Sequence, residues 1–398
     1  MRTTWVPGAD EAGYGADNLP YGVFVHDGAA PRVGVRVGEW VLDLAGALGD
    51  PEFEEPSLNR FMARGSTAWR ATRAKVTGML AAEKGRAAAE PHLVPLSQVE
   101  LLRPFSVGDR AVFHGSAEHA ACMQRLLRPG TGGLPERWYT QPVGRHGRAG
   151  AVAASGRGIR RPAGQYADRD GTGPRMGPST RVDAEAHLGF VVGMPTPPGR
   201  SVPVSGFVEH VFGAVLMADF SARDVEAWEA VPLGPLTGAS FAAPVSPWVL
   251  PTDALGAARF RGRRQSPAPL PHLARIADWG LRIRFEIALN GEVVSRPPYG
   301  AMYWTPDQLL AHLTGNGAAL RTGDLYTSGA VSGGEPGQRG SLLELEGAGE
   351  APLRLSGGSA RSYLQDGDTV EVGAWAQGMG GGVIRLGEVS ASLLPAGD

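Results

Sequence analysis

The sequence predicts an α+β fold that is mostly β, and three observations support this prediction. The chain holds 58 glycines and 32 prolines, which break its later part into short β-like runs. These runs lie at 187–192, 281–289, 353–355, 369–374 and 382–386. No regular helices alternate with them, so a β-rich domain is expected instead of a parallel βαβ sheet.

Two units are predicted along the chain, residues 1–104 and residues 105–398. In the first unit, residues 21–25 and 32–42 alternate apolar and other side chains, which is the period of a strand. The residues between them, 26–31, are rich in turn formers, so the two strands are expected to form a hairpin.

Two helices are expected after this hairpin, at 57–64 and 66–83. Their apolar residues recur at the spacing of one helix face, which is typical of ordinary packing against a core. A connector at 87–91 then leads into the second unit.

Composition excludes several classes of function. The formal net charge is −2 over 398 residues, so bulk electrostatics favours neither nucleic acid nor an anionic membrane. Cys122 is the only cysteine, which excludes an internal disulfide. We see no apolar signal segment at the N-terminus and no uninterrupted apolar run long enough to span a membrane, so a cytoplasmic protein is expected.

A carboxylate and an imidazole stand two residues apart in a strand-like run at 181–192. Side chains at this spacing on a strand point to the same face, so Glu185 and His187 could bind one metal ion together. The alternative is an ordinary strand face, because Glu-x-His is a weak signal by itself.

An apolar run ends at Asp219, and a helix start is expected just after it. Ser221 is predicted as the N-cap, with Asp224 three residues later as in a capping box. Arg223 would then lie in the first turn, where backbone N–H groups favour anions. The alternative is that Asp219 and Arg223 simply form an ion pair.

The segment 109–125 carries two histidines, His114 and His119, near another expected helix start. Cys122 follows His119 by about one turn, so a Cys–His nucleophile pair is conceivable, although a lone histidine is usually structural. We find no Gly-x-Ser-x-Gly elbow, no His-Glu-x-x-His and no Cys-x-x-Cys.

Residues 215–235, which end in Pro232-Leu-Gly-Pro235, resemble the core active-site segment of the fumarylacetoacetase family. Further blocks resemble that family in the same order, at 18–24, 142–149, 155–162, 246–249, 302–305, 341–345 and 364–368. The resemblance implies a small SH3-like N-terminal domain, a C-terminal β-roll, a homodimer, and a metal-dependent hydrolase that cleaves C–C bonds in 1,3-dicarbonyl compounds.

The resemblance also assigns a general base and a metal site. The base falls on His119, and the glutamate that orients it falls on Glu344. Of four metal-binding carboxylates, two match at Glu185 and Asp219. The other two positions hold His187 and Val112 where the family has Glu and Asp.

A site with this donor set favours Mn²⁺, Fe²⁺ or Zn²⁺ over Mg²⁺ or Ca²⁺. The alternative is a site without metal, in which Arg145 supplies the missing positive charge.

Several positions that contact the substrate in the family hold different residues in this sequence. Arg128 and Arg223 match the substrate-binding arginines of the family. The changed positions are Glu226 for Gln, Ala239 for Lys, His114, Arg145 and Ala230 for Tyr, and Ala330 for Thr. Lysine occurs only at positions 75 and 84, so none further along can replace the lost one.

Losing one positioned donor to a developing negative charge costs roughly 3 kcal/mol, so little turnover of fumarylacetoacetate is expected. The sequence therefore predicts an enzyme of this fold that acts on another small molecule, within specialised metabolism. Hydrolytic C–C cleavage is the leading hypothesis. The alternatives are enolate chemistry of a lyase, decarboxylase, isomerase or cyclase, and a homologue that only binds a ligand or a partner.

Overall fold

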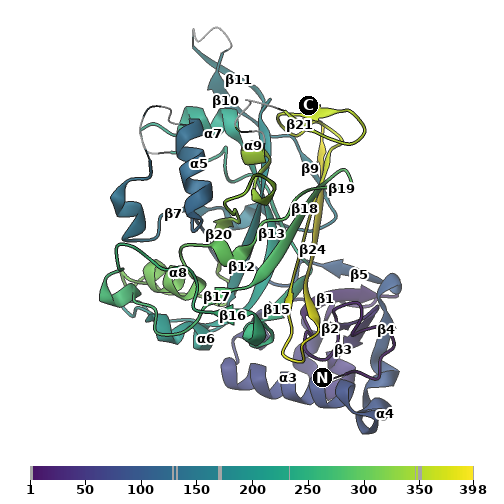
Figure 1. The fold of residues 1–398 in the computed structure, drawn as a ribbon. Helices are drawn as coiled ribbons and strands as arrows, with labels where there is room; N and C mark the ends of the chain where they lie inside the picture. Colours follow the sequence, from purple (N-terminus) through teal and green to yellow (C-terminus); the bar gives the residue numbers. More distant parts are fainter. Residues whose placement is uncertain are drawn as a thin grey trace.

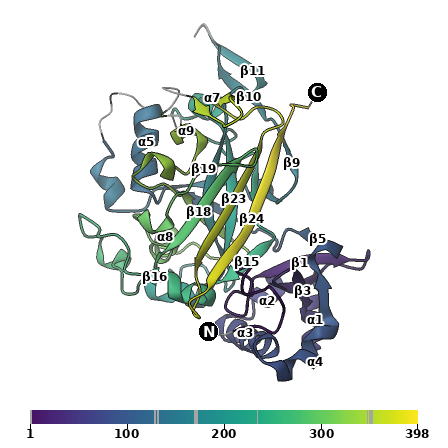
Figure 2. The same ribbon diagram turned by 45° about the vertical axis from the view of Figure 1, so that its right-hand side comes forward.

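The structure is a computed structural model that describes residues 3–127, 130, 133–168, 173–232, 234–345, 347 and 352–397. Two views show the N-terminal region, drawn in purple to dark blue, at one end of the molecule, with the larger β-rich region beyond it (Figures 1 and 2). The fold is mostly β, as the sequence predicts.

The N-terminal region combines short strands with helices. Its strands are β1 (Tyr21–His26), β2 (Arg32–Val37), β3 (Trp40–Asp43), β4 (Leu93–Pro95) and β5 (Val99–Leu102). Its helices are α1 (Leu44–Leu48), α2 (Asn59–Met62), α3 (Ser66–Ala81) and α4 (Arg86–Ala89). The predicted hairpin is confirmed, because β1 pairs antiparallel with β2. The first predicted helix is shorter than expected.

One large sheet runs through both regions in the order β4-β3-β2-β1-β15-β13-β12-β20-β6-β7. Its strands beyond the N-terminal region are β6 (Arg110–Phe113), β7 (Gly144–Gly147), β12 (Val182–Val192), β13 (Val211–Ala222), β15 (Trp248–Pro251) and β20 (Leu325–Ala330). Two short strands, β8 (Val152–Ala154) and β14 (Ala243–Val245), extend it beside β13. Because β1 pairs with β15, the two regions are joined by strand pairing.

A second sheet, in the order β19-β18-β23-β24-β9, lies over the first, and its strands β18, β19, β23 and β24 are drawn in green to yellow at the front of Figure 2. Its strands are β9 (Gly158–Arg160), β18 (Ile283–Leu289), β19 (Glu292–Ser295), β23 (Thr369–Gln377) and β24 (Val383–Leu394). Smaller pairs are β10 (Ala163–Ala167) with β11 (Pro174–Pro178), β16 (Arg259–Phe260) with β17 (Gly280–Leu281), and β21 (Leu353–Arg354) with β22 (Ala360–Arg361).

Short helices cover the edges of the β-rich region. They are α5 (Ala117–Leu127), α6 (Phe207–His210), α7 (Arg223–Glu229), α8 (Pro306–Leu313) and α9 (Leu342–Leu345). Figures 1 and 2 both show α5, α7 and α9 grouped at the end away from the N-terminal region. Within the described residues, no helix has the length and apolar character needed to cross a membrane.

Strands β12 and β13 are buried along both faces, and the two faces pack against different parts of the molecule. One face, which includes Leu188, Leu216 and Phe220, belongs to the main hydrophobic core. The opposite face carries Val191 and Val215, which pack with the N-terminal region. Further along the strands, this second face becomes polar, and that polar patch is where the candidate site lies.

Candidate functional site

The polar patch begins with carboxylates placed opposite each other on β12 and β13. The register of this antiparallel pair sets Glu185 directly across from Asp219. Asp183 and His187 flank Glu185 on the same face because side chains two apart on a strand share a face. The prediction that Glu185 and His187 lie side by side is therefore confirmed, and their side chains bond at 2.8 Å between Oε2 and Nε2.

A buried histidine–glutamate pair stands beside these carboxylates. His119 lies in the first turn of α5, and its Nδ1 is 2.8 Å from Oε2 of Glu344 on α9. The hydroxyls of Ser332 and Ser341 donate to the same Glu344 oxygen. Glu344 is thereby fixed from three directions, so it orients the imidazole and leaves its Nε2 facing Glu185 at 3.6 Å.

The charge state of His119 follows from its neighbours. Burial lowers the pKa of this imidazole, but the carboxylates of Glu344 and Glu185 outweigh burial and raise the pKa to about 9. His114 lies against His119 with nearly parallel rings. Burial and the neighbouring His119 lower the pKa of His114 to about 3. At neutral pH, His119 is therefore charged and His114 is neutral.

Arg223 connects several of these groups from the start of α7. Its guanidinium donates to Asp183 at 2.6 Å, to Glu226 at 2.7 Å, and also to Glu185. The predicted N-cap at Ser221 is wrong, because β13 continues to Ala222 and the helix has no side-chain cap. The arginine still lies in the first turn, where the sequence placed it.

Asp219 does not pair with Arg223, which corrects the alternative considered from the sequence. Its Oδ2 is instead 2.5 Å from Nη2 of Arg110, a residue of β6 that is completely buried. Nη2 of Arg145, on β7, lies 3.7 Å from the same oxygen, and Nδ1 of His187 lies 3.8 Å from it. Two guanidiniums and one imidazole thus surround this carboxylate.

This arrangement does not fit the divalent metal that the resemblance implies. Among the described residues, no group of three or more His, Cys, Asp or Glu side chains is placed to hold a metal ion. Glu185 and His187, the two side chains expected to bind the metal, are hydrogen-bonded to each other. Nε2 of His187 carries the proton of this bond, so it has no free lone pair with which to bind a metal. Asp219 faces a guanidinium, and Val112 offers no donor atom. The metal at Glu185, His187 and Asp219 stays a prediction that the geometry does not support.

The substrate positions inferred from the resemblance lie around the same patch. Arg145 has about a fifth of its side chain exposed (18%), and its Nη1 donates to the backbone oxygen of Ala239 at 2.8 Å. Ala330 is buried on β20 opposite His187. Glu226 is half-buried beside Arg223, and Arg128 lies outside the described residues.

Cys122 is buried, and burial raises the pKa of its thiol. Nδ1 of His119, the residue proposed as its partner, is engaged by Glu344. An activated nucleophile needs a lowered pKa, so the Cys–His pair is not formed in the way the sequence allowed.

Two charged residues of the polar patch were missed from the sequence, Asp183 and Arg110. Asp183 is two residues before Glu185 in the same strand, so the strand period already placed it on the polar face. Arg110 is two residues before Val112, and the same spacing was available there. What the sequence did not reveal is that its guanidinium reaches across to β13.

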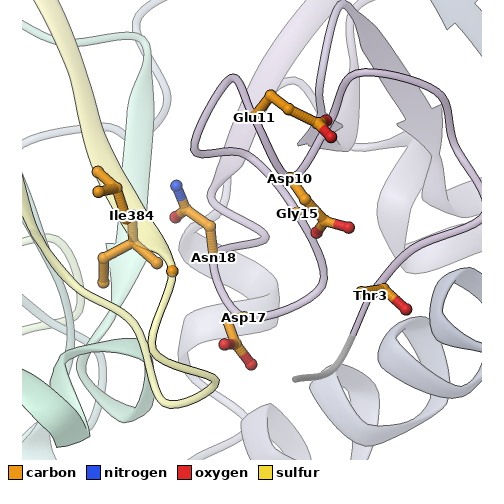
Figure 3. Close-up of a pocket in the computed structure, with 9 residues that line it drawn as sticks. Thr3, Asp10, Glu11, Gly15, Asp17, Asn18 and Ile384 are labelled. Atoms are coloured by element: carbon orange, nitrogen blue, oxygen red, sulfur yellow. The ribbon is translucent and has the colours of Figure 1, made fainter.

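Two cavities help to locate where ligands could approach. One, of about 190 Å³, lies over β6 and β7 and is lined by Val112, Arg145 and His312, so it borders the site. Another, of about 290 Å³, lies where N-terminal loops carrying Asp10 and Asp17 meet β24 (Figure 3). The residues that line this second cavity include none of the base and arginine groups of the polar patch.

Two family models match almost the whole chain. The fumarylacetoacetase N-terminal model matches residues 17–104, and the fumarylacetoacetate hydrolase C-terminal model matches residues 110–391. The chain is 37% identical to the fumarylacetoacetase of Homo sapiens over 415 residues, covering 99% of each chain. It is also 37% identical to that of Oryza sativa subsp. japonica, covering 95% of this chain and 94% of the relative.

Solved structures of low identity share the fold. A fumarylacetoacetate hydrolase from Exiguobacterium antarcticum has a TM-score of 0.56 at 17% identity, covering 95% of this chain and 99% of that one. A maleylpyruvate hydrolase from Sphingobium, in complex with manganese(II) and pyruvate, has a TM-score of 0.54 at 14% identity, covering 95% and 100%. With the dyad, the fold and the two family matches in agreement, this chain is an enzyme that belongs to the fumarylacetoacetase family.

Proposed function

We propose that this enzyme hydrolyses a C–C bond in a 1,3-dicarbonyl compound other than fumarylacetoacetate. The observation that carries the proposal is the His119–Glu344 dyad, which is complete and buried next to a row of charged groups. A held imidazole with one nitrogen bonded to a carboxylate is the arrangement that general-base catalysis requires. A homologue that only binds a ligand would have no need to bury such a pair.

In this mechanism, His119 takes a proton from water at Nε2. The water oxygen attacks one carbonyl carbon, the adjacent C–C bond breaks, and the electron pair leaves on the other fragment as an enolate. That enolate is then protonated. Because the pKa of His119 is raised to about 9, the neutral form that acts as the base is the minor form at neutral pH. After it has taken the proton from water, the charged imidazole can donate this proton to the enolate.

The positive charge that meets the enolate is assigned to Arg145 and Arg223. The Arg145 guanidinium bonds to the backbone of Ala239, at the position where the resemblance places a lysine in the family. A cation therefore reaches the neighbourhood of the lost lysine, but from another strand. This relocation supports a substrate with a different shape or an additional anionic group.

The test is a product assay by mass spectrometry on a panel of 1,3-diketones and acylated 3-oxo acids, with fumarylacetoacetate included. We expect cleavage of a panel member and loss of most activity in both His119→Ala and Glu344→Gln. The matched control is His210→Ala, whose histidine lies outside the site and bonds to a backbone oxygen. Full activity in His119→Ala would rule out the base. Turnover of fumarylacetoacetate within about tenfold of a human-type enzyme, about 1.4 kcal/mol in barrier, would contradict the altered specificity.

A second candidate is enolate chemistry without hydrolysis, as in an isomerase or a decarboxylase. It is favoured by the position of His119 between two carboxylates, which holds a proton where an enolate could receive it. The same assay in D₂O separates the two functions, because isomerisation would place deuterium in a product of unchanged carbon skeleton.

We also infer that the enzyme works as a cytoplasmic homodimer whose chain divides after residue 104. The inference rests on the family resemblance. Sedimentation at micromolar concentration should show about twice the chain mass of 41.7 kDa. A single species of the chain mass would argue against the dimer.

A further inference from the structure

Arg110 is a fully buried arginine whose position the reaction proposed above does not explain. It lies on β6, which is separated from β13 in the sheet order by β20 and β12. Its side chain nevertheless reaches two residues of β13, with Nη2 3.8 Å from the sulfur of Met217 and 2.5 Å from Oδ2 of Asp219. A long charged side chain has thus been brought across two strands to one carboxylate.

The surroundings of Arg110 are shaped to receive it. Gly147 is its partner on β7, and a Cβ atom there would come within 3.0 Å of the Arg110 side chain. Val112 shares its strand face but has no polar atom. Nε and Nη1 of Arg110 make no hydrogen bond in the part of the chain that the structure describes. The guanidinium therefore contributes its charge to Asp219 much more than a set of hydrogen bonds.

Each carboxylate of the patch already has a partner, although the five carboxylates outnumber the three guanidiniums. Its carboxylates are Asp183, Glu185, Asp219, Glu226 and Glu344. Its guanidiniums are Arg110, Arg145 and Arg223. A buried carboxylate without a partner is the one that most strongly attracts a further cation, and every carboxylate here already contacts a cation or an imidazole.

We propose that the Arg110 guanidinium is a fixed internal cation that takes the place of the divalent metal implied by the family resemblance. It neutralises Asp219, and Val112 on the same strand face leaves no carboxylate to attract a metal. A metal ion at Asp219 would lie beside a guanidinium and be repelled by it. The proposal concerns cation binding alone, so it stands or falls independently of the reaction assigned above.

The first test is direct metal binding to the full-length protein without a histidine tag. The chelator-treated enzyme is dialysed against Mn²⁺, Mg²⁺ or Zn²⁺, and metal per chain is measured by elemental analysis. We expect far less than one ion per chain and no rise in the unfolding temperature at about 1 mM Mn²⁺, because binding to the folded state would raise it. One Mn²⁺ or Mg²⁺ per chain, lost in Asp219→Asn, would overturn the proposal.

The second test restores a metal site by design. The double variant Arg110→Met, Val112→Asp removes the cation and adds a carboxylate on the same face of β6, so it should bind about one Mn²⁺ per chain and unfold at a higher temperature when Mn²⁺ is present. A folded double variant that binds no metal would count against the role of Arg110. If this variant does not fold, the wild-type measurement decides the proposal alone.

Two control variants show whether any metal binding gained by the double variant is specific to the loss of the Arg110 charge. Arg110→Lys keeps a positive charge and should stay free of metal. Arg361→Met removes a guanidinium that pairs with the buried carboxylate of Asp368 elsewhere in the chain. It should also bind no metal, because a single carboxylate is a poor ligand set. Metal binding by Arg361→Met to the same extent as by the double variant would mean that any unpaired buried carboxylate suffices.

Discussion

Asp307 shows what a buried carboxylate costs when no cation is placed beside it. It lies in the first turn of α8, it is completely buried, and neither of its oxygens makes a hydrogen bond of normal geometry in the described structure. Burial raises the pKa of this carboxyl to about 6, despite the neighbouring hydroxyl of Thr305. The oxygens of Asp219 likewise make no hydrogen bond of normal geometry in the described structure, but the guanidinium of Arg110 lies beside one of them.

The raised pKa of Asp307 makes stability depend on pH. Between pH 4 and 6 the folded state holds a proton that the unfolded state has lost, so stability falls as pH rises through this window. Asp307→Asn is neutral throughout and should therefore be more stable than wild type at pH 8, by up to about 3 kcal/mol. The advantage should shrink at pH 5. Urea unfolding at the two pH values measures this, with exposed Asp278→Asn as the control. An advantage independent of pH would exclude the charge as its cause.

Single residues also show where sequence reasoning reached the site. Local spacing was enough to place Glu185 beside His187, and the family resemblance was needed to match His119 with Glu344, because 225 positions separate them. The partner of Arg110 could not be inferred in the same way. Its contact with Asp219 depends on how β6, β20 and β12 are ordered in the sheet. The order of strands in a sheet cannot be inferred from the local sequence pattern of each strand.

At the scale of elements, the site depends on the register of β12 and β13. Because side chains alternate between faces, a slip of one residue would turn Glu185 and Asp219 into the hydrophobic core and bring Ala184 and Ala218 to the polar patch. Both faces of these strands are buried, so the correct register is strongly favoured. The same pairing explains the wrong N-cap. Ser221 has a local signal for a helix start, but it pairs with Asp183 and so remains in the strand.

At the scale of the whole molecule, the two regions share one hydrophobic cluster although the sequence divides them after residue 104. Tyr21 and Phe61 from the N-terminal region pack against Phe212 of β13, with ring centroids 5.5 and 5.7 Å away. The cluster also takes residues from strands well beyond the division, namely Val152, Val191, Val215, Met217, Ala243, Val245, Val249 and Leu325. The pattern of strands and turns predicted the units, but it contained no information on how their faces meet.

This shared cluster predicts that residues 105–398 will not fold as a separate protein. Removing residues 1–104 would expose Phe212, Val215 and Met217 to water, at roughly 1.5–3 kcal/mol for each large apolar side chain. The eight large apolar side chains that residues 105–398 contribute to the cluster would together cost roughly 12–24 kcal/mol, which is comparable to or larger than the roughly 5–15 kcal/mol that stabilises a typical domain. It would also leave β15 without its partner β1, an open strand edge that favours aggregation. Expression of 105–398 should therefore give insoluble protein, and co-expression of 1–104 as a separate chain should restore solubility by covering the same face. A fragment 105–398 that is monodisperse and unfolds cooperatively would show instead that the cluster is an interface between two self-sufficient domains.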